Sequence, residues 1–314
     1  MSLLEPIPKN YRSGFVALIG RPNVGKSTLV NQIIGKKVAI TSPVAQTTRN
    51  RLRAILTTPE AQLVIVDTPG IHKPHHLLGE RLVQRARMTI GEVDVVLLLL
   101  DACYFPGKGD YFIVNLLKQN KIPVLVALNK CDLVRGDDYL QKKAAYGNLL
   151  IDSEWPIYPC SAVNGEGCSK LIEALANKLP VGHKLYPAEM VSDQPEKVLL
   201  SELIREQVLL KTKEEVPHSV AVTIDRLEEI SSDQNRKKNK SYTAILATIL
   251  VERKSQKGIL IGKGGSMLKS IGQGARLQMQ LLIEGPVFLE LFVKVVPDWR
   301  CKPARLAQLG YGEN

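Results

Sequence analysis

The sequence predicts an α/β domain with a doubly wound, mostly parallel sheet, followed by a smaller α+β domain. Its 314 residues exceed the roughly 100–200 residues of a typical domain, which favours two domains. Short apolar runs alternate with amphipathic stretches as far as about residue 180, as in α/β folds. After a segment containing three prolines this alternation stops. We therefore predict domains at 13–180 and 197–300, joined by a linker at 181–196 and followed by a tail at 301–314.

The strands of the first domain are predicted from runs of consecutive apolar residues, which are typical of strands buried on both faces. These runs are Phe15–Ile19, Leu63–Val66, Val93–Leu100, Ile122–Leu128 and Pro156–Pro159. An extra strand at Arg51–Thr57 should lie beside Leu63–Val66. Amphipathic stretches predict helices at Lys26–Ile34, Leu78–Gly91, Lys108–Gln119, Asp138–Ile151 and Cys168–Leu179.

The second domain should contain strands that lie together with helices on one side. Helices are predicted at Val198–Lys211, near Gln256–Ile261 and at Ser266–Leu282. Strands are predicted at Ser219–Leu227, Ser241–Arg253 and Val287–Val296.

Composition and charge restrict the class of protein. The longest apolar run, Val95–Leu100, is far too short to cross a bilayer, and the N-terminal residues have no apolar core of signal-peptide length. The five cysteines are an odd number and form no CxxC pair, so we expect a reduced intracellular compartment and no zinc site. The net charge is +11, and Arg236–Arg276 holds ten basic residues with one acid, Glu252. Charge alone indicates either a polyanionic partner or a solvated lysine-rich face.

A phosphate-binding loop is predicted between the first strand and the first helix. Gly20-Arg21-Pro22-Asn23-Val24-Gly25-Lys26-Ser27, continued by Thr28, fits GxxxxGK[ST] in the strand–loop–helix context that the motif requires. Backbone N–H groups of such a loop point at phosphates. Lys26 should reach the β- and γ-phosphates, and the Ser27 hydroxyl should bind Mg²⁺.

Asp67-Thr68-Pro69-Gly70 follows the apolar strand Leu63–Val66. An acid at the carboxyl end of a strand, near the phosphate loop, can hold Mg²⁺ through water. The Gly70 N–H can contact a γ-phosphate, and glycine there permits a hinge that moves on hydrolysis.

Two further motifs predict a guanine site. Asn129-Lys130-Cys131-Asp132 follows one predicted strand, and Ser161-Ala162 follows the next. The Asp132 carboxylate can accept hydrogen bonds from N1–H and the 2-amino group of guanine, whereas adenine offers a lone pair at N1. Asn129 should touch the other base edge, Lys130 should cover the base, and the Ala162 N–H should donate to O6. The first domain is thus predicted to bind GTP and GDP.

With these motifs the chain resembles the Era-like ribosome-assembly GTPases, over about Ser13–Arg300. The resemblance also rests on Gln46-Thr47-Thr48-Arg49, Asp67–Pro74, Ser201–Glu206, Glu252–Gly265, Leu289–Lys294 and Trp299-Arg300. It implies a P-loop GTPase domain followed by a type II KH domain. It also implies a Mg²⁺-binding threonine in the first switch, either Thr48, which we prefer, or Thr47. Lys26, Thr48 and Gly70 are then the predicted catalytic residues, with Mg²⁺ held by Ser27, Thr48 and Asp67.

The position after Gly70 is Ile71, where Ras-like proteins have a water-orienting glutamine. Isoleucine cannot orient water, so we expect slow intrinsic hydrolysis. Asn23 resembles the asparagine that relatives use to hold K⁺ beside the phosphates; alternatively it supports the loop backbone. His72 is either a base or a solvated switch residue, and Arg49 either a charge donor or a structural or RNA-facing residue.

Gly262-Lys263-Gly264-Gly265 lies between two predicted helices, which is the GXXG arrangement of a KH domain. Predicted phosphate contacts come from the basic residues Lys254, Lys257, Lys263, Lys269 and Arg276. Ile259, Ile261 and Met267 would wall an apolar groove, or else belong to ordinary core packing.

The resemblance implies a GTP-hydrolysing switch that binds the 3′ region of 16S ribosomal RNA and assists 30S subunit assembly, as a cytoplasmic monomer. In the GTP state Ala39–Asn50 and Pro69–Leu78 should be ordered. The alternative is a nucleotide-gated adaptor, either on an anionic membrane surface such as the inner membrane face or linked to tRNA. Arg51, Arg53, the loop Ser231–Lys240 and the tail Cys301–Asn314 have no assigned role.

Overall fold

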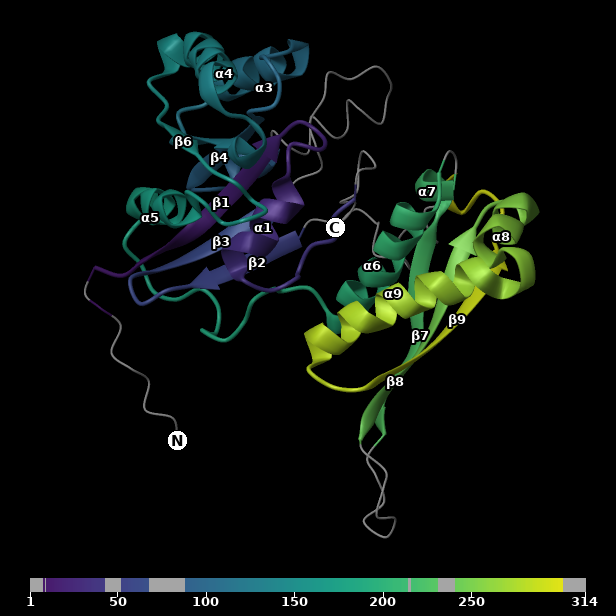
Figure 1. Ribbon diagram of the computed structural model, residues 1–314. Helices are drawn as coiled ribbons and strands as arrows, with labels where there is room; N and C mark the ends of the chain where they lie inside the picture. Colours follow the sequence, from purple (N-terminus) through teal and green to yellow (C-terminus); the bar gives the residue numbers. More distant parts are fainter. Residues whose placement is uncertain are drawn as a thin grey trace. The chain divides into compact units, whose positions relative to one another are not determined.

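The computed structural model of the chain describes residues 8, 10–42, 52–67, 88–213, 216–230 and 241–301 (Figure 1). Contacts divide the chain into two compact units. The first unit comprises Met1–Ala39 and Arg51–Asp193, and the second comprises Ile40–Asn50 and Gln194–Asn314. Within the described residues, no helix combines the length and apolar character needed to span a membrane.

The first unit is built on a six-stranded sheet in the order β2-β3-β1-β4-β5-β6. Its strands are β1 (Arg12–Gly20), β2 (Leu52–Thr57), β3 (Ala61–Asp67), β4 (Val95–Asp101), β5 (Val124–Asn129) and β6 (Ile157–Pro159). All neighbouring pairs are parallel except β2 and β3, which are antiparallel. The predicted doubly wound sheet, with its extra strand beside β3, is confirmed.

Helices cover both faces of this sheet (Figure 1). They are α1 (Lys26–Ile34), α3 (Lys108–Lys118), α4 (Gly136–Leu150) and α5 (Cys168–Lys178). α1 and α5 pack on one face through residues such as Leu29 and Leu171, and α3 and α4 pack on the other through Ile113 and Tyr146. Of the predicted helix Leu78–Gly91, only the last turn, from Met88, lies within the described residues, and it is helical.

Residues 181–193, expected to act as a linker, are fixed to the first unit. Gln62 of β3 is fully buried; its Oε1 accepts hydrogen bonds from the N–H groups of Leu185 (2.6 Å) and Tyr186 (2.9 Å), and its Nε2 donates to the Tyr186 carbonyl (2.9 Å). Arg53 of β2 forms an ion pair with Asp193 at 3.1 Å. Arg53, which had no role in the sequence analysis, therefore holds this segment, and the division between the units falls after Asp193.

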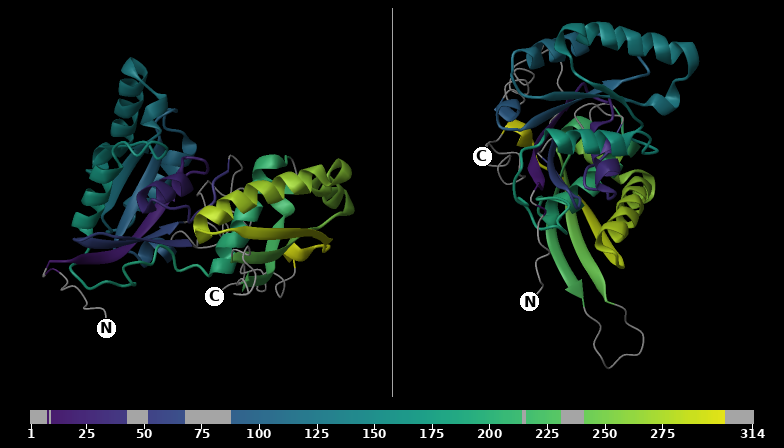
Figure 2. Two further views of the ribbon diagram at one scale, coloured as in Figure 1. Left: turned by 60° about the horizontal axis from the view of Figure 1, so that its bottom comes forward. Right: turned by 90° about the vertical axis from the view of Figure 1, so that its left-hand side faces the viewer.

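The second unit has a three-stranded sheet in the order β7-β8-β9. Its elements are α6 (Glu196–Lys211), α7 (Val216–Ser219), β7 (Ala221–Ile230), β8 (Tyr242–Val251), α8 (Lys254–Ile261), α9 (Ser266–Ile283) and β9 (Val287–Val295). β7 and β8 are antiparallel, whereas β8 and β9 are parallel. Helices α6, α8 and α9 share one apolar core with one face of the sheet, which confirms the α+β arrangement (Figures 1 and 2).

A glycine of α9 lies against a side chain of α6. A Cβ atom at Gly274 would lie 2.1 Å from Oε1 of Gln207 on α6, so a larger residue there would require the Gln207 side chain to move. The four-residue helix α7 was not predicted. Pro217 fixes a helical φ in its first turn, and the strand expected from Ser219 starts two residues later, at Ala221.

Candidate functional site

The loop between β1 and α1 has the backbone geometry of an anion cradle. Asn23 and Gly25 take left-handed conformations, with φ of 64° and 99°. A Cβ at Gly25 would lie 2.4 Å from Nδ2 of Asn129, and one at Gly20 would lie 2.7 Å from the Leu99 carbonyl oxygen. Glycine is required at both positions because these atoms lie too close to the backbone for a side chain to fit. The loop ends at the N-terminus of α1, where backbone N–H groups favour negative charge.

Lys26 lies inside this loop. Its Nζ donates to the carbonyl oxygens of Gly20 (3.1 Å) and Arg21 (2.9 Å), and only 8% of the residue is exposed. Burial lowers the pKa of Lys26 to about 8, and the nearby Asp67 carboxylate opposes this change. A desolvated ammonium group held by neutral carbonyls gains considerably from a phosphate, so the environment fits the phosphates of a nucleotide.

A hydroxyl and a carboxylate meet beside Lys26. The Ser27 Oγ donates to Oδ2 of Asp67 at 3.3 Å, and Asp67 is fully buried at the end of β3. Oxygen ligands of this kind are those that Mg²⁺ prefers, next to substrate phosphates. Ser27 and Asp67 thus lie together as the sequence predicted.

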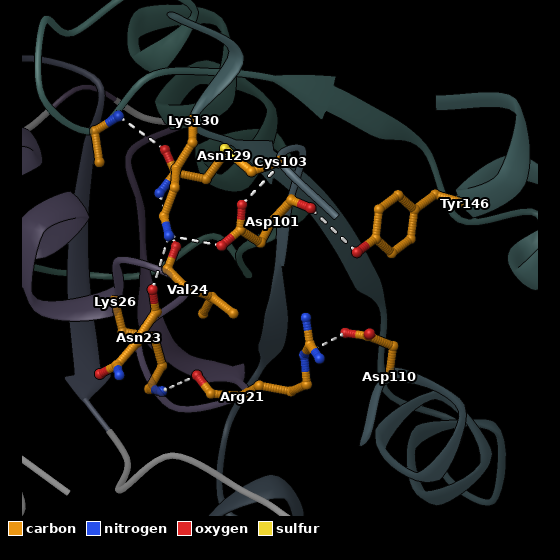
Figure 3. A network of polar contacts seen from close by, with 11 residues as sticks. Arg21, Asn23, Val24, Lys26, Asp101, Cys103, Asp110, Asn129, Lys130 and Tyr146 are labelled. Atoms are coloured by element: carbon orange, nitrogen blue, oxygen red, sulfur yellow. Dashed lines mark hydrogen bonds and ion pairs between the residues drawn. The ribbon is translucent and has the colours of Figure 1, made fainter. Parts of the chain in front are cut away.

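The guanine motif is braced against the phosphate loop (Figure 3). The Asn129 Nδ2 donates to the Val24 carbonyl at 2.9 Å, and its Oδ1 accepts from the Ala162 N–H at 2.9 Å. Lys130 donates to the Asn23 carbonyl (2.9 Å) and pairs with Asp101 (2.6 Å). In this structure Asn129 and the Ala162 N–H bind each other rather than standing free for the base edge and O6, as the sequence analysis expected. Asn129 therefore joins the phosphate loop to the base loop.

Asp132 has the environment expected of a guanine-reading carboxylate. Its Oδ1 is buried and has no hydrogen-bond partner among the described residues. A buried acceptor without a donor is costly, by about 1–3 kcal/mol. The N1–H and 2-amino groups of guanine are donors that would satisfy it, so the residues fit this base.

Ser161 supports the loop that presents Ala162. It is fully buried, and its Oγ accepts from the Asn164 N–H at 3.3 Å. Its own N–H donates to the Glu166 carbonyl at 2.9 Å. Ser161 therefore shapes the base loop through its own hydrogen bonds.

Sequence reasoning missed a second layer of residues behind the loop (Figure 3). Arg21 pairs with the fully buried Asp110 at 3.0 Å, and burial raises the pKa of Asp110 while the Gly107 N–H and the Arg21 guanidinium oppose that rise. The Tyr146 hydroxyl donates to the Asp101 carbonyl at 3.1 Å. An acid at the end of an apolar strand was the available signal for Asp101, since Asp67 ends β3 in the same way.

A cavity of about 530 Å³ opens beside the phosphate loop. Its lining consists of Arg21, Pro22, Asn23, Val24, Asp101, Tyr104, Phe105 and Lys130. Tyr104 and Phe105 are 63% and 54% exposed, and neither was singled out from the sequence.

Several predicted residues cannot be placed. Thr47, Thr48, Arg49, Gly70, Ile71 and His72 lie outside the described residues. Thr28 is described and belongs to α1.

The second unit contains the predicted glycine turn between α8 and α9. Gly262, Gly264 and Gly265 have φ of 70°, 60° and 80°, values that favour glycine. A Cβ at Gly262 would lie 2.8 Å from the Cβ of Met267. The turn therefore brings the backbone of the GXXG segment against the start of α9.

A groove of about 370 Å³ runs from this turn between α9 and β9. It is lined by Gly265, Leu268, Lys269, Gly272, Gln273, Arg276, Leu289 and Leu291. Lys269 and Arg276 were predicted, whereas the apolar walls Leu268, Leu289 and Leu291 were not. A Cβ at Gly272 would lie 3.3 Å from Leu291, so this glycine keeps the groove open.

The other predicted contacts lie outside the groove lining. Lys254 and Lys263 are exposed, Lys257 and Ile261 are half-buried, and Ile259 is 52% exposed on α8. Met267 packs against the core of the unit, which supports its alternative assignment. The roles of Ile259 and Ile261 stay predictions.

Comparisons with known proteins find relatives of both units. Residues 15–130 match the family model described as 50S ribosome-binding GTPase, and residues 215–300 match the KH domain model. GTPase Era of Nostoc sp. is 56% identical over 304 residues, covering 97% of this chain and 91% of the relative. GTPase Era of Heliobacterium modesticaldum is 49% identical over 305 residues, covering 97% and 99%.

Solved structures agree in fold over both units. Era in complex with MgGDPNP and nucleotides 1506–1542 of 16S ribosomal RNA is 37% identical, with a TM-score of 0.86, covering 96% of this chain and 100% of that one. A variant of Aquifex aeolicus Era bound to GDP·AlF4⁻ is 36% identical, with the same TM-score and coverage. The relatives named GTPase Era are about half identical to this chain and are matched over nearly their whole length, and both family models agree with them. This chain therefore belongs to the Era family of GTPases.

Proposed function

We propose that this chain uses GTP hydrolysis to control its binding of the 3′ region of 16S ribosomal RNA, and that it assists assembly of the 30S ribosomal subunit. The observation that carries the proposal is the presence, in one chain, of a carboxylate, Asp132, whose Oδ1 is buried without a hydrogen-bond partner among the described residues, and of a groove at a glycine turn lined by Lys269 and Arg276. The solved Era complex holds MgGDPNP and a 16S RNA segment, and it supports the same pairing of ligands here.

On the nucleotide side, Lys26 neutralises the β- and γ-phosphates, and Ser27 and Asp67 would hold Mg²⁺. When bound, that ion supplies positive charge against the phosphate oxygens. Thr48 and Gly70 complete the proposed site by contacting Mg²⁺ and the γ-phosphate respectively. Ile71 cannot orient the attacking water, so basal turnover should be slow.

Asn23 is the proposed K⁺ ligand. Its left-handed backbone, with φ of 64°, is one that asparagine tolerates better than most residues, and its carbonyl accepts from Lys130. A monovalent cation beside the phosphates would add charge where an arginine finger acts in other GTPases.

On the RNA side, the GXXG backbone and the α9–β9 groove would hold single-stranded RNA. Lys269 and Arg276 line the groove, and the exposed Lys254 and Lys263 add phosphate contacts that carry affinity without base selection. Leu268, Leu289 and Leu291 would pack against bases.

In this proposal, residues 13–180 bind the nucleotide and residues 197–300 bind RNA. We propose a monomer that acts in the cytosol. The alternative is that the basic residues bind an anionic membrane surface in place of RNA.

The test is GTP turnover by the purified protein in K⁺ or Na⁺ buffer. RNA ending in the 16S 3′ sequence, a scrambled RNA of equal length and anionic lipid vesicles are added separately. We expect stimulation by the 16S sequence alone, and faster turnover in K⁺. Equal stimulation by scrambled RNA or by vesicles would overturn the RNA assignment, and equal rates in K⁺ and Na⁺ would overturn the role of Asn23.

A further inference from the structure

The first turn of α3 holds one side chain of the phosphate loop (Figure 3). The Arg21 Nε lies 3.0 Å from Oδ1 of Asp110, whose side chain is fully buried. The other carboxylate oxygen, Oδ2, accepts the Gly107 N–H at 2.8 Å. A buried carboxylate is costly without an opposite charge nearby, so the Asp110 ion pair ties Arg21 firmly to α3.

Two glycines make room for the Arg21 side chain. A Cβ at Gly109 would lie 2.7 Å from the Arg21 Cδ, and one at Gly107 would lie 3.4 Å from its Nη1. The aliphatic part of Arg21 therefore lies against Gly109, and its guanidinium group lies near Gly107. Neither glycine has a left-handed backbone, so the close approach of Arg21, and not a special φ, is what favours a small residue at Gly109.

The backbone of Arg21 links this contact to the phosphate-binding lysine. The Lys26 Nζ donates to two carbonyl oxygens, those of Gly20 at 3.1 Å and Arg21 at 2.9 Å. Gly20 ends β1 and pairs with Leu99 of β4, so the sheet orients its carbonyl. Arg21 lies just beyond the strand, and its ion pair with α3 restrains it instead. The sheet thus fixes one acceptor of Lys26, and α3 restrains the other.

We propose that Asp110 is a positioning residue for Lys26. By holding Arg21 it keeps the Arg21 carbonyl where it directs the Lys26 ammonium group at the phosphates. This inference rests on the proposed function, in which Lys26 neutralises the β- and γ-phosphates. Misplacement of a reacting group by about 1 Å can cost about 100-fold in rate, so a contact behind the loop can control hydrolysis.

A single added methyl group tests this role without changing any charge. Gly109→Ala should displace the Arg21 side chain, because the new Cβ would lie 2.7 Å from the Arg21 Cδ. Alanine is also a better helix former than glycine, so α3 itself should not be weakened. Gly147→Ala is the matched control: it is the same change in α4 of the same unit, where a Cβ would meet nothing within 4 Å.

Two further variants test the ion pair. Asp110→Asn removes the charge and keeps an oxygen that can accept the Gly107 N–H. Adding Arg21→Met to Asp110→Asn removes both charges, keeps an unbranched side chain over Gly109 and leaves no buried carboxylate unpaired. If Arg21 acts through Asp110, this second change should lower the rate no further, within about twofold.

The measurements are the single-turnover rate constant of GTP hydrolysis, the affinity for a fluorescent GDP analogue, and the phosphorus NMR shift of the β-phosphate of bound GDP. We expect the rate constant to fall about tenfold or more in Gly109→Ala and in Asp110→Asn, with GDP affinity within about threefold of wild type. The β-phosphate resonance should shift in both variants, because the ammonium group beside it has moved. Gly147→Ala should match the wild type in all three.

The outcomes separate the inference from the proposed function. Wild-type turnover in Lys26→Ala overturns the proposed phosphate contact, and the inference with it. If Lys26→Ala loses activity, a wild-type rate in either Gly109→Ala or Asp110→Asn overturns the inference alone. It is also overturned by an equal loss in Gly147→Ala, or by slower hydrolysis with an unshifted β-phosphate resonance, which would mean that Asp110 only stabilises the fold.

The remaining outcomes concern the pair itself. A further tenfold loss on adding Arg21→Met would show that Arg21 does not act through Asp110, which overturns the inference. If circular dichroism shows that Asp110→Asn does not fold, Gly109→Ala decides, because it leaves both charges in place.

Discussion

The nucleotide site and the RNA groove bind anions in different ways. In the first unit, Lys26, Asp101, Asp110 and Asn129 are almost fully buried, and hydrogen bonds and ion pairs of 2.6–3.1 Å hold them in place. In the second unit the basic side chains at the turn and groove, Lys263, Lys269 and Arg276, are exposed, and the fixed element is the glycine backbone. A small ligand of defined shape is recognised by a preorganised buried network, whereas a flexible polyanion is held by exposed charges that follow it.

We expect substitutions of the buried residues of the first unit to cause the largest losses of activity. Lys26→Ala removes the cation that neutralises the phosphates and leaves the Gly20 and Arg21 carbonyls without their donor. GTP turnover should fall at least about 1000-fold, in the range seen when a preorganised charge is lost. Steady-state phosphate release checks this, with circular dichroism to confirm folding. Turnover at the wild-type rate would mean that the phosphates bind elsewhere.

The next effect concerns base choice. Asp132→Asn replaces one acceptor by a donor that faces the guanine N1–H and 2-amino groups. GTP affinity should fall about 100-fold, through the loss of two hydrogen bonds to a charged group. Xanthosine triphosphate, which has a carbonyl at C2, should bind the variant better than GTP does. Competition against a fluorescent GDP analogue measures both, and an unchanged preference for GTP would remove Asp132 from the base site.

The RNA groove should show a smaller effect that is confined to RNA. Replacing Lys263 and Gly264 by Asp puts two negative charges on the turn and a side chain at a φ of 60°. RNA affinity should fall about 30-fold or more, while basal GTP turnover stays within about twofold. Fluorescence anisotropy with labelled RNA checks the first result. Lys254→Ala, which loses one exposed phosphate contact, should cost only about threefold and serves as the graded control.

Lys26 should also give nucleotide affinity a pH dependence, which is smaller than the main effects above. Without nucleotide, Lys26 has a pKa of about 8, so it is charged below that pH and neutral above it. A bound phosphate favours the charged form, so binding takes up a proton above pH 8 and affinity falls as pH rises. Between pH 7.5 and 9 the loss should be up to about tenfold. Lys26→Arg stays charged throughout, and the Lys26-dependent part of the profile should vanish in it; its persistence would assign the proton to another group.

Much of this architecture follows from local sequence. The strands of the first unit are apolar runs, and the residues of the phosphate loop and base loop occur at spacings set by the chemistry of phosphate and guanine. Lys26, Ser27 and Asp132 could therefore be found without a structure. The sequence also predicts that these residues lie close together, because parallel strands bring their carboxyl ends to one edge of the sheet.

The second layer could not be found in this way. Asn129 bridges Val24 and Ala162, and Arg21 reaches Asp110, across many residues and from unrelated motifs. Long-range hydrogen bonds depend on how elements pack, which sequence periodicity does not specify.

The segment 181–193 has a practical consequence for dividing this protein into parts. The buried Gln62 amide has three of its hydrogen bonds with Leu185 and Tyr186. A shortened polypeptide that stops at residue 180 would expose that amide and the edge of β2, and would invite aggregation during expression. One that ends after Asp193 keeps the Arg53 ion pair. A protease that cleaves the native chain between its parts should accordingly act near Gln194 and Pro195, and leave the preceding segment attached.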